Sequence, residues 1–229
     1  MTKENLMNPP AAQIDDLTGL LSRKAFLSAF DSELERLKGN SLPLSLAFAD
    51  IDHFLEINEK YGHQVGDFVL KAVADTAREV LPENTFIGRY GGDEFILLFP
   101  GTERETVFLL MEKFRLSIAE MTISTMKEND EVKGVSISAG ISCSPIDGSL
   151  RSEIMRKADQ ALYRAKISGR GRIKLATDER MLPKTSHYTQ TQLERLTKLA
   201  SERQAGEAEL LREALDDLIA KYGVNEIER

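Results

Sequence analysis

The sequence lacks the features of a membrane-spanning or secreted protein. No apolar run approaches the roughly 20 residues that a helix needs to cross a bilayer, and the densest stretch is Phe95 to Phe99. Residues 1–13 have neither the basic start nor the apolar middle of a signal peptide. The single cysteine, Cys143, cannot form an internal disulfide, and we expect it to be a small buried residue at the end of a strand. These absences predict a cytoplasmic protein with no membrane partner.

Basic residues are also in short supply. The chain has 30 lysine and arginine residues against 37 acidic ones, which gives a formal net charge of −7. Such a chain is poorly suited to broad electrostatic binding of nucleic acid or of an anionic membrane surface. A phosphate-bearing ligand would therefore have to be held by a few placed cations, by a metal ion or by backbone amides.

Apolar periodicity predicts helices that alternate with strands. The expected helices are 22–37, 65–80, 103–121 and 151–167, and the expected strands are 42–49, 85–89, 94–99, 135–142 and 172–175. Gly91 and Gly92, between two of these strands, are a hairpin signal. The pattern is typical of an α/β domain with a mixed central sheet, flanking helices and a β-hairpin. We expect a short lead-in over residues 1–14, this domain over 15–177 and a small, mainly helical unit over 178–229.

Acidic residues stand where two of the predicted strands meet their turns. Asp50 and Asp52 follow the strand 42–49, and Asp93 and Glu94 lie in the hairpin turn. If these strands are neighbours, the carboxylates converge on one edge of the sheet, where open α/β sheets bind their ligands. Clustered carboxylates repel one another unless a cation lies between them, and hard oxygen ligands suit Mg²⁺. The sequence therefore predicts a site for metal-assisted phosphoryl transfer. The alternative is that these residues only cap the strand and the turn.

Five segments resemble the motifs of the GGDEF-family diguanylate cyclases. They are 89–95 (RYGGDEF), 15–20 (DDLTGL) followed by Arg23, 50–52 (DID) leading to Asn58, Gly62, His63, Gly66 and Asp67, 136–140 (SISAG), and 158–166 (ADQALYRAK) leading to Gly169 and Arg170. The order and spacing of the segments are those of the family, and the resemblance spans about 15–175. It implies a nucleotide-cyclase-like fold and an enzyme that condenses two GTP molecules into cyclic di-GMP with release of pyrophosphate.

The resemblance also implies which residues carry the chemistry. Asp50, the backbone carbonyl of Ile51 and Asp93 correspond to ligands of Mg²⁺, for which Mn²⁺ is a substitute. Glu94 corresponds either to a ligand of a second metal ion or to the base that takes the proton of the attacking 3′-hydroxyl. Arg89 resembles an arginine that contacts phosphate or guanine when two such domains meet, so the resemblance implies a dimer and a nearly inactive monomer.

The implied contacts with GTP fall into two groups. Asn58 and Asp67 resemble the pair that hydrogen-bonds the guanine edge, and a carboxylate can accept from the N1–H and amino groups that adenine does not offer. Lys166 and Arg170 would bind the triphosphate, and we expect them one helical turn apart on the same face.

Backbone groups are the remaining part of the implied substrate site. The amides around His53 and Phe54 should cradle the terminal phosphates. Gly91 and Gly92 complete the site, because glycine lets the backbone turn sharply there.

The chain departs from the family pattern in two places that bear on function. Leu55 stands where the family usually has a lysine, which removes a cation from the phosphate site. Many relatives carry Arg-x-x-Asp ahead of the signature as an inhibitory product site, and the corresponding segment here is Pro82-Glu83-Asn84-Thr85. We therefore expect no product inhibition through that segment.

The C-terminal segment 178–229 shows a weaker resemblance to ribbon-helix-helix units, which dimerise and often bind DNA. It has an expected strand or linker over 178–187 and expected helices over 192–203 and 208–221. Its 8 basic and 11 acidic residues are unusual for a DNA binder, so a helical hairpin that only dimerises is an equal alternative. Either way, two short helices cannot bury their leucines alone, and we expect a homodimer through this segment.

Other functions stay open at this stage. The chain could be a catalytically weak receptor for GTP or cyclic di-GMP, or a regulator that binds DNA through the C-terminal segment. The short lead-in leaves us to expect no upstream sensory domain, so the C-terminal segment is the candidate for pairing two catalytic domains. We expect a chain cut after Leu175 to be a folded but weakly active monomer.

Overall fold

The computed structural model describes residues 13–38, 42–124, 131–176, 186–203 and 206–222. The chain divides into two compact units, Met1–Asp178 and Glu179–Arg229. Most of the predicted lead-in, and most of the predicted strand or linker that joins the units, lies outside the described residues. Within the described parts of the chain, no helix has both the length and the apolar character that crossing a bilayer requires.

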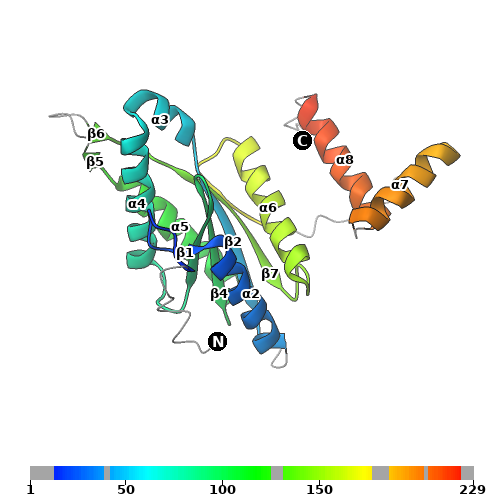
Figure 1. Cartoon of the computed structure of the whole chain (residues 1–229), viewed down its shortest axis with the longest axis horizontal. Helices are drawn as coiled ribbons and strands as arrows, with labels where there is room; N and C mark the ends of the chain where they lie inside the picture. The colour runs from blue at the N-terminus through cyan, green and yellow to red at the C-terminus, as the bar shows by residue number, and fades with distance from the viewer. Residues whose placement is uncertain (1–12, 39–41, 125–130, 177–185, 204–205, 223–229) are drawn as a thin grey trace. The chain divides into compact units, whose positions relative to one another are not determined.

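A six-stranded mixed sheet with the order β1-β3-β4-β2-β7-β8 forms the centre of the first unit (Figure 1). Its strands are β1 (Leu21–Ser22), β2 (Leu44–Ile51), β3 (Phe86–Gly91), β4 (Glu94–Pro100), β7 (Ile137–Ser144) and β8 (Ile173–Leu175). The outer pairs β1·β3 and β7·β8 are parallel, and the pairs between them are antiparallel. The predicted α/β fold with a mixed sheet is confirmed.

Helices cover both faces of this sheet, as Figure 1 shows. They are α2 (Arg23–Lys38), α3 (Phe54–Tyr61), α4 (His63–Val80), α5 (Arg104–Glu120) and α6 (Arg151–Ile167). Successive residues of a strand point to opposite faces. Leu46 of β2 accordingly packs with residues of α2 and α6, whereas Ala47 packs with residues of α4 and α5. Because β2 is buried along its whole length, Asp50 near its end enters an environment with little water.

Helix α6 lies unusually close to β7. A side chain at Gly140 would come within 2.1 Å of the carbonyl oxygen of Ala158 and of the amide nitrogen of Leu162. Only glycine allows the helix backbone to approach the strand this closely. At the start of the helix, the Glu153 carboxylate accepts a hydrogen bond from the Leu150 N–H at 3.0 Å. The helix is therefore held at its start and along its length. This fixes the position of Lys166, which lies in its last turn.

The helices and strands predicted for this unit lie within two residues of the observed bounds, and four short elements were missed. Helix α3 has eight residues and no fully buried side chain, so its apolar pattern is too brief to be recognised. Strands β1, β5 (Ile123–Ser124) and β6 (Glu131–Val132) have two residues each. Such strands are defined by the partner they pair with and not by alternation in their own sequence.

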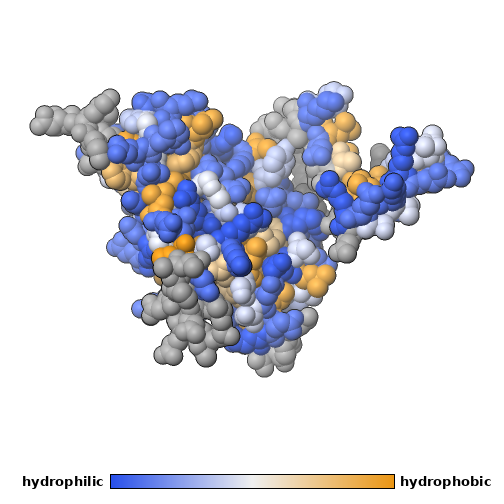
Figure 2. Space-filling model, in the orientation of Figure 1, coloured by the Kyte–Doolittle hydropathy of each residue, from blue (hydrophilic) through white to orange (hydrophobic). Residues whose placement is uncertain are grey.

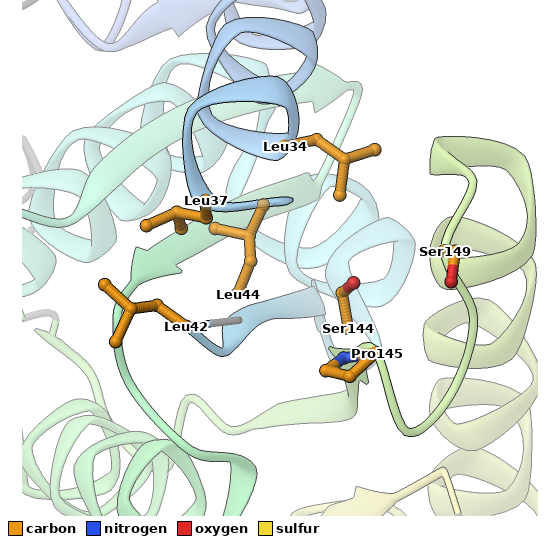
Figure 3. Close-up of a pocket in the computed structure, with 7 residues that line it drawn as sticks. All are labelled: Leu34, Leu37, Leu42, Leu44, Ser144, Pro145 and Ser149. Atoms are coloured by element: carbon orange, nitrogen blue, oxygen red, sulfur yellow. The ribbon is translucent and has the colours of Figure 1, made fainter. Parts of the chain in front are cut away.

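A small apolar hollow lies at the end of the sheet opposite Asp50. It has a volume of about 130 Å³ and is lined by Leu34, Leu37, Leu42, Leu44, Ser144, Pro145 and Ser149 (Figure 3). Leu44 begins β2 and Asp50 nearly ends it, so the hollow and the acidic residues are roughly 20 Å apart at the usual rise of a strand. The hollow is not part of the acidic site.

The second unit is a helical hairpin of α7 (Gln190–Arg203) and α8 (Glu207–Lys221), close to the expected ranges 192–203 and 208–221. Ala200 and Leu210 are buried, and Thr197 Oγ1 donates to Glu207 Oε1 at 2.5 Å. Residues 186–189 form no strand. Large apolar side chains remain exposed on both helices, and hydrophobic surface is visible on this hairpin in Figure 2. They are Leu193, Leu199, Leu215, Leu218 and Ile219, with Tyr222 just after α8.

Candidate active site

Three acidic residues come together where β2 ends and the β3–β4 hairpin turns. Asp50 is the partner of Glu94 in the β2·β4 ladder. One residue further along, the Ile51 N–H donates to the carbonyl oxygen of Asp93 at 3.3 Å. Gly92 in the turn has a φ of 51°, which glycine adopts without strain. The strand register thus places Asp50, Asp93 and Glu94 together at one end of the central strands β2 and β4.

Burial and mutual repulsion disfavour the ionised forms of these carboxyl groups. Asp50 is 7% exposed. Burial raises its pKa to about 6, and the charges of Asp93 and Glu94 act in the same direction. Burial and the charge of Asp93 likewise raise the pKa of Glu94. Lys166 opposes both shifts, since its Nζ lies 2.7 Å from Asp50 Oδ2 and its charge also favours ionised Glu94. These three carboxyl groups therefore form a site that attracts cations, and the ammonium group of Lys166 is bound there.

Helix α6 adds a carboxylate that the sequence analysis did not count among the site residues. Asp159 lies seven residues before Lys166, so the two share a helix face. Burial raises the pKa of Asp159, and the charge of Lys166 opposes the shift. The charge of Asp159 in turn adds to the effects of burial and Asp93 on Glu94. The spacing within 158–166 was the signal that could have identified it.

The donor set at this end of the strands fits a hard divalent cation. Carboxylate oxygens of Asp50, Asp93 and Glu94 and the carbonyl of Ile51 are the ligand types that Mg²⁺ prefers. The raised pKa values of Asp50 and Glu94 mean that added positive charge would relieve a repulsion present in the protein. In the described residues, however, no three Asp, Glu, His or Cys side chains are already gathered as a metal site. Lys166 takes one oxygen of Asp50 instead.

Asp52 does not belong to the acidic cluster with which the sequence analysis grouped it. Its side chain is buried, and both of its oxygens accept hydrogen bonds. Ser138 Oγ donates to Oδ1 at 2.7 Å, Ser136 Oγ donates to Oδ2 at 2.8 Å, and the Gly171 N–H also donates to Oδ2 at 3.0 Å. The carboxylate thus joins the end of β2 to β7 and to the turn after α6.

The sequence predicted that Lys166 and Arg170 lie one helical turn apart, and this prediction was wrong. Helix α6 ends at Ile167, and the next residues form a turn in which Gly169 has a φ of 106° and Arg170 a φ of 58°. The glycine in this position ends the helix, as is common at helix C-termini. Arg170 is exposed in this turn, whereas Lys166 contacts Asp50. The two cations therefore come to the site from different local structures.

Arg89 is held within its own chain. Its Nε and Nη2 donate to the carbonyl oxygen of Gly92 at 2.9 and 2.7 Å, and Nη1 lies 3.3 Å from both oxygens of Asp15. The neighbouring Tyr90 ring is covered by the guanidinium of Arg23, which is 4.2 Å from the ring centroid. The bond to Gly92 supports the hairpin turn from within. The contact with phosphate or guanine of a second domain is not seen in a single chain.

The segment after Asp52 turns sharply into α3. His53 has a φ of 56° and Phe54 begins the helix, so the first amides of α3 have no carbonyl partner within the helix. Such amides are a suitable cradle for phosphate oxygens. His53 Nδ1 is 2.5 Å from Glu56 Oε1, which directs the ring toward its own helix. Leu55, at the position of the missing lysine, is 67% exposed.

The candidate guanine-binding residues lie on two packed helices. Asn58 is on α3 and Asp67 is on α4, and the two helices contact each other. Gly66 makes this packing possible, because a side-chain carbon there would lie 2.0 Å from Asn58 Oδ1 and 3.2 Å from the Phe54 ring. The Asn58 side chain thus packs directly against Gly66, the residue before Asp67.

We expect Gly66→Ala to weaken binding of GTP, the substrate that the family resemblance implies, without unfolding the protein. The new methyl group must displace the Asn58 side chain, whose Oδ1 would lie only 2.0 Å away, and this should raise the KM for GTP roughly tenfold. Alanine is the better helix former by about 1 kcal/mol, so the thermal unfolding midpoint should not fall. Steady-state kinetics and a melting curve would test both statements, with Glu79→Ala, exposed near the far end of α4, as the control. An unchanged KM would contradict the role given to Gly66.

Comparisons with known proteins agree with this geometry. Residues 12–172 match the family described as diguanylate cyclase, GGDEF domain. The diguanylate cyclase DgcP of Pseudomonas aeruginosa is 40% identical over 166 residues, which cover 72% of this chain and 24% of DgcP. A diguanylate cyclase of Vibrio cholerae is 37% identical over 161 residues, which cover 70% of this chain and 49% of that protein.

A solved structure shows the same likeness in three dimensions. The GGDEF domain of DgcB from Caulobacter crescentus, determined in complex with c-di-GMP, superimposes with a TM-score of 0.69 at 32% identity. The match covers 74% of this chain and 96% of that domain. The chain thus spans a quarter to a half of the two curated relatives and nearly all of the solved domain. On the family match, the sequence identities and the fold together, the chain belongs to the GGDEF family of diguanylate cyclase domains.

Proposed function

We propose that the chain is a diguanylate cyclase, which joins two GTP molecules into cyclic di-GMP and releases two molecules of pyrophosphate. The observation that carries the proposal is the group of three carboxylates, Asp50, Asp93 and Glu94, at the end of β2 and the hairpin turn. The Nζ of Lys166 contacts Asp50 there. Carboxylates that bind a divalent cation, together with a lysine, suit a reaction in which the negative charge on phosphate oxygens must be neutralised. GTP as the substrate also places the reaction in the cytoplasm.

Each of the two condensations is a phosphoryl transfer. The 3′-oxygen of one GTP forms a bond to the α-phosphorus of the other, the bond from that phosphorus to the bridging oxygen breaks, and pyrophosphate leaves with the electron pair. The proton of the 3′-hydroxyl passes to a base. Glu94, whose pKa is raised by burial and by Asp93, is placed either to take that proton or to hold a second metal ion. The protein contributes mostly by positioning and by charge.

Diguanylate cyclases of this family generally depend on a divalent metal. Here Mg²⁺, with Mn²⁺ as a substitute, would be held by Asp50, the Ile51 carbonyl, Asp93 and Glu94. When bound, the metal would neutralise charge on the phosphates of GTP. Lys166, whose Nζ lies 2.7 Å from Asp50 Oδ2, would supply a further positive charge for the triphosphate.

The other residues of the site bind the ends of GTP. Asn58 and Asp67 would hydrogen-bond the guanine edge from α3 and α4. The amides of His53 and Phe54 at the start of α3 would bind the terminal phosphates, with Arg170 from the turn after α6. Gly91 and Gly92 leave room at the hairpin for the reacting phosphate, since a side-chain carbon added at either position would meet no atom within 4 Å.

Each domain would hold one GTP, so two domains must face each other for the reaction to occur. The exposed leucines of α7 and α8 supply the surface through which we propose that two chains pair. DNA is a weaker candidate partner, because residues 178–229 carry a net charge of −3. A gel-shift experiment at physiological salt would distinguish a hairpin that binds DNA from one that only dimerises.

The proposed function is tested by incubating the purified chain with GTP and Mg²⁺ and identifying the products by mass. We expect cyclic di-GMP and pyrophosphate from the wild type and neither from Asp93→Ala or Glu94→Ala. Product from the wild type and both variants would point to a contaminating enzyme. No product at high protein concentration would contradict the proposal, and Leu55→Lys would then show whether the missing lysine is the cause.

We expect the enzyme to be insensitive to its own product. The segment that carries an inhibitory Arg-x-x-Asp in many relatives is Pro82–Thr85 here, an exposed turn closed by a hydrogen bond from the Thr85 N–H to the Pro82 carbonyl. It holds no arginine or aspartate to bind cyclic di-GMP. Initial rates should stay constant when cyclic di-GMP is added before GTP. Inhibition that is noncompetitive with GTP would show that a product site exists elsewhere.

A further inference from the structure

The Asp52 carboxylate is the meeting point of three chain segments: the end of β2, the start of β7 and the turn after α6. Besides its three side-chain hydrogen bonds, its backbone N–H donates to the Ser136 carbonyl at 2.9 Å. Only 4% of the residue is exposed, so these bonds are shielded from water. A buried group whose two oxygens accept three hydrogen bonds holds the donors at fixed positions relative to one another.

Two of these segments border the proposed triphosphate site. Asp52 immediately precedes His53 and Phe54, whose amides begin α3. On the other side, Gly171 immediately follows Arg170 in the turn after α6. The turn is also bound to α6, because the Arg170 N–H donates to the Ala165 carbonyl at 3.1 Å, and to β7, because the Ala139 N–H donates to the Arg172 carbonyl at 3.0 Å. Asp52 adds the bond that joins this turn directly to the start of α3, and so helps to set where the α3 amides lie relative to Arg170.

We propose that Asp52 is a positioning residue for the triphosphate of GTP, which it does not itself touch. It acts through the backbone at His53 and through Gly171, and it holds an anion-binding amide group and a cation at a fixed separation. This inference rests on the proposed function, because it assumes that GTP occupies the site. A purely structural role would lower stability and leave the affinity of the folded protein for GTP unchanged.

Asparagine should replace Asp52 well, whereas alanine should not. The asparagine Oδ1 can accept from Ser136 and from Gly171, and its amino group can donate to Ser138 Oγ, since a hydroxyl can turn to accept. Alanine leaves all three donors without a partner. Ser136→Ala together with Ser138→Ala removes the two hydroxyl donors and keeps the carboxylate, which gives a milder second route to the same loss.

Asp147 provides a matched control. It is buried at 1% exposure near the opposite end of β7, and its Oδ2 accepts from the Cys143 N–H at 2.8 Å. Asp147→Ala thus removes a buried carboxylate of similar setting, far from the α3 amides and from Arg170. Its effect measures what a general loss of stability does to GTP binding.

The experiment measures the affinity of each full-length chain for 3′-deoxy-GTP with Mg²⁺, a nucleotide that lacks the attacking hydroxyl and cannot be condensed, and then the KM and kcat with GTP. We expect Asp52→Ala to weaken the affinity and raise the KM roughly 10- to 100-fold, with a smaller change in kcat. Asp52→Asn should stay within about threefold of the wild type, and the double serine variant should lie between them. Asp147→Ala should melt earlier with an unchanged KM.

An unchanged affinity in folded Asp52→Ala would overturn the inference, as would an equal loss in Asp147→Ala. If Asp52→Ala does not fold, the double serine variant decides: a raised KM supports the inference and an unchanged KM overturns it. If the wild type binds 3′-deoxy-GTP but makes no cyclic di-GMP from GTP, only the proposed function would be contradicted. The measured affinities of the variants would still test the role of Asp52. A wild type that does not bind the nucleotide would overturn both.

Discussion

Asp50→Asn is expected to abolish most cyclic di-GMP synthesis and, at the same time, to stabilise the metal-free protein. The substitution removes a charge that the phosphate site needs, which should lower kcat by roughly 10²- to 10³-fold. It also removes a buried negative charge that destabilises the folded protein. This destabilisation is reflected in the pKa of Asp50, which burial raises to about 6. Asparagine can still accept the hydrogen bond from Lys166, so little is lost in exchange.

The stabilisation should depend on pH in a definite direction. The pKa of Asp50 is higher in the folded protein than in the unfolded chain, so folding favours its protonated form. The wild type and the variant should be about equally stable near pH 4, and the variant should gain on the order of 1–3 kcal/mol as the pH rises past about 6. Thermal unfolding with a chelator present, at about pH 4 and about pH 7.5, would measure this difference.

Added Mg²⁺ supplies the control for this prediction. It should raise the melting temperature of the wild type, since a ligand that binds only the folded state stabilises it, and should have a much smaller effect on Asp50→Asn. A variant that is less stable than the wild type in chelator at neutral pH would show that the ion pair with Lys166 outweighs the cost of burial. The charge argument would then be wrong.

Removal of the second unit is expected to make activity strongly dependent on protein concentration. The chain cut after Asp178 should fold, because the first unit ends there and has its own core. A cut after Asp178 also keeps Ala176, which the cut after Leu175 expected from the sequence would remove. Ala176 is buried, and its N–H donates to the Ile141 carbonyl beside β8. Without α7 and α8, two catalytic units must meet by diffusion, so the specific activity at low concentration should fall by at least roughly tenfold.

Initial rates over a roughly hundredfold range of protein concentration, with sedimentation to give the mass, would test the truncation. Leu215→Glu with Leu218→Glu in the full chain is a second route to the same loss, since both leucines are exposed on α8. Fusion of an unrelated dimeric coiled coil to the first unit should restore part of the activity. Full specific activity of a truncated monomer at low concentration would show that the hairpin does not pair the catalytic units.

The fold could be predicted from the sequence where buried elements are long. Strand β2 and helix α6 have enough apolar positions for their period to be recognised, and the Gly91–Gly92 pair marked the hairpin. Helix α3 was missed because it packs only one side of eight residues against α4. The end of α6 at Ile167 was predicted correctly, but Arg170 was still expected one helical turn after Lys166. That expectation was wrong because Gly169 and Arg170 have positive φ angles and leave the helical path.

The site could be predicted less completely, because side-chain partners depend on the sheet order. The sequence placed Asp50, Asp93 and Glu94 at turns, and the β2·β4 register brought them to one end of these strands. It could not show that Asp52, two residues from Asp50, turns to the serines of β7, since that pairing depends on which strand lies beside β2. For the same reason, the contact of Arg89 with Asp15, 74 residues away, was not foreseen.

The two outermost strands of the sheet are very short. Strand β1 has two residues and β8 has three, so each edge offers only a few unpaired backbone groups. Long exposed edges are the templates through which sheets add strands from other molecules. Copies of the catalytic unit are therefore poorly equipped to fuse into a continuous sheet. Under the proposed function, encounters between two units would then be mediated by side chains and reversible, so that the units could separate and release the product.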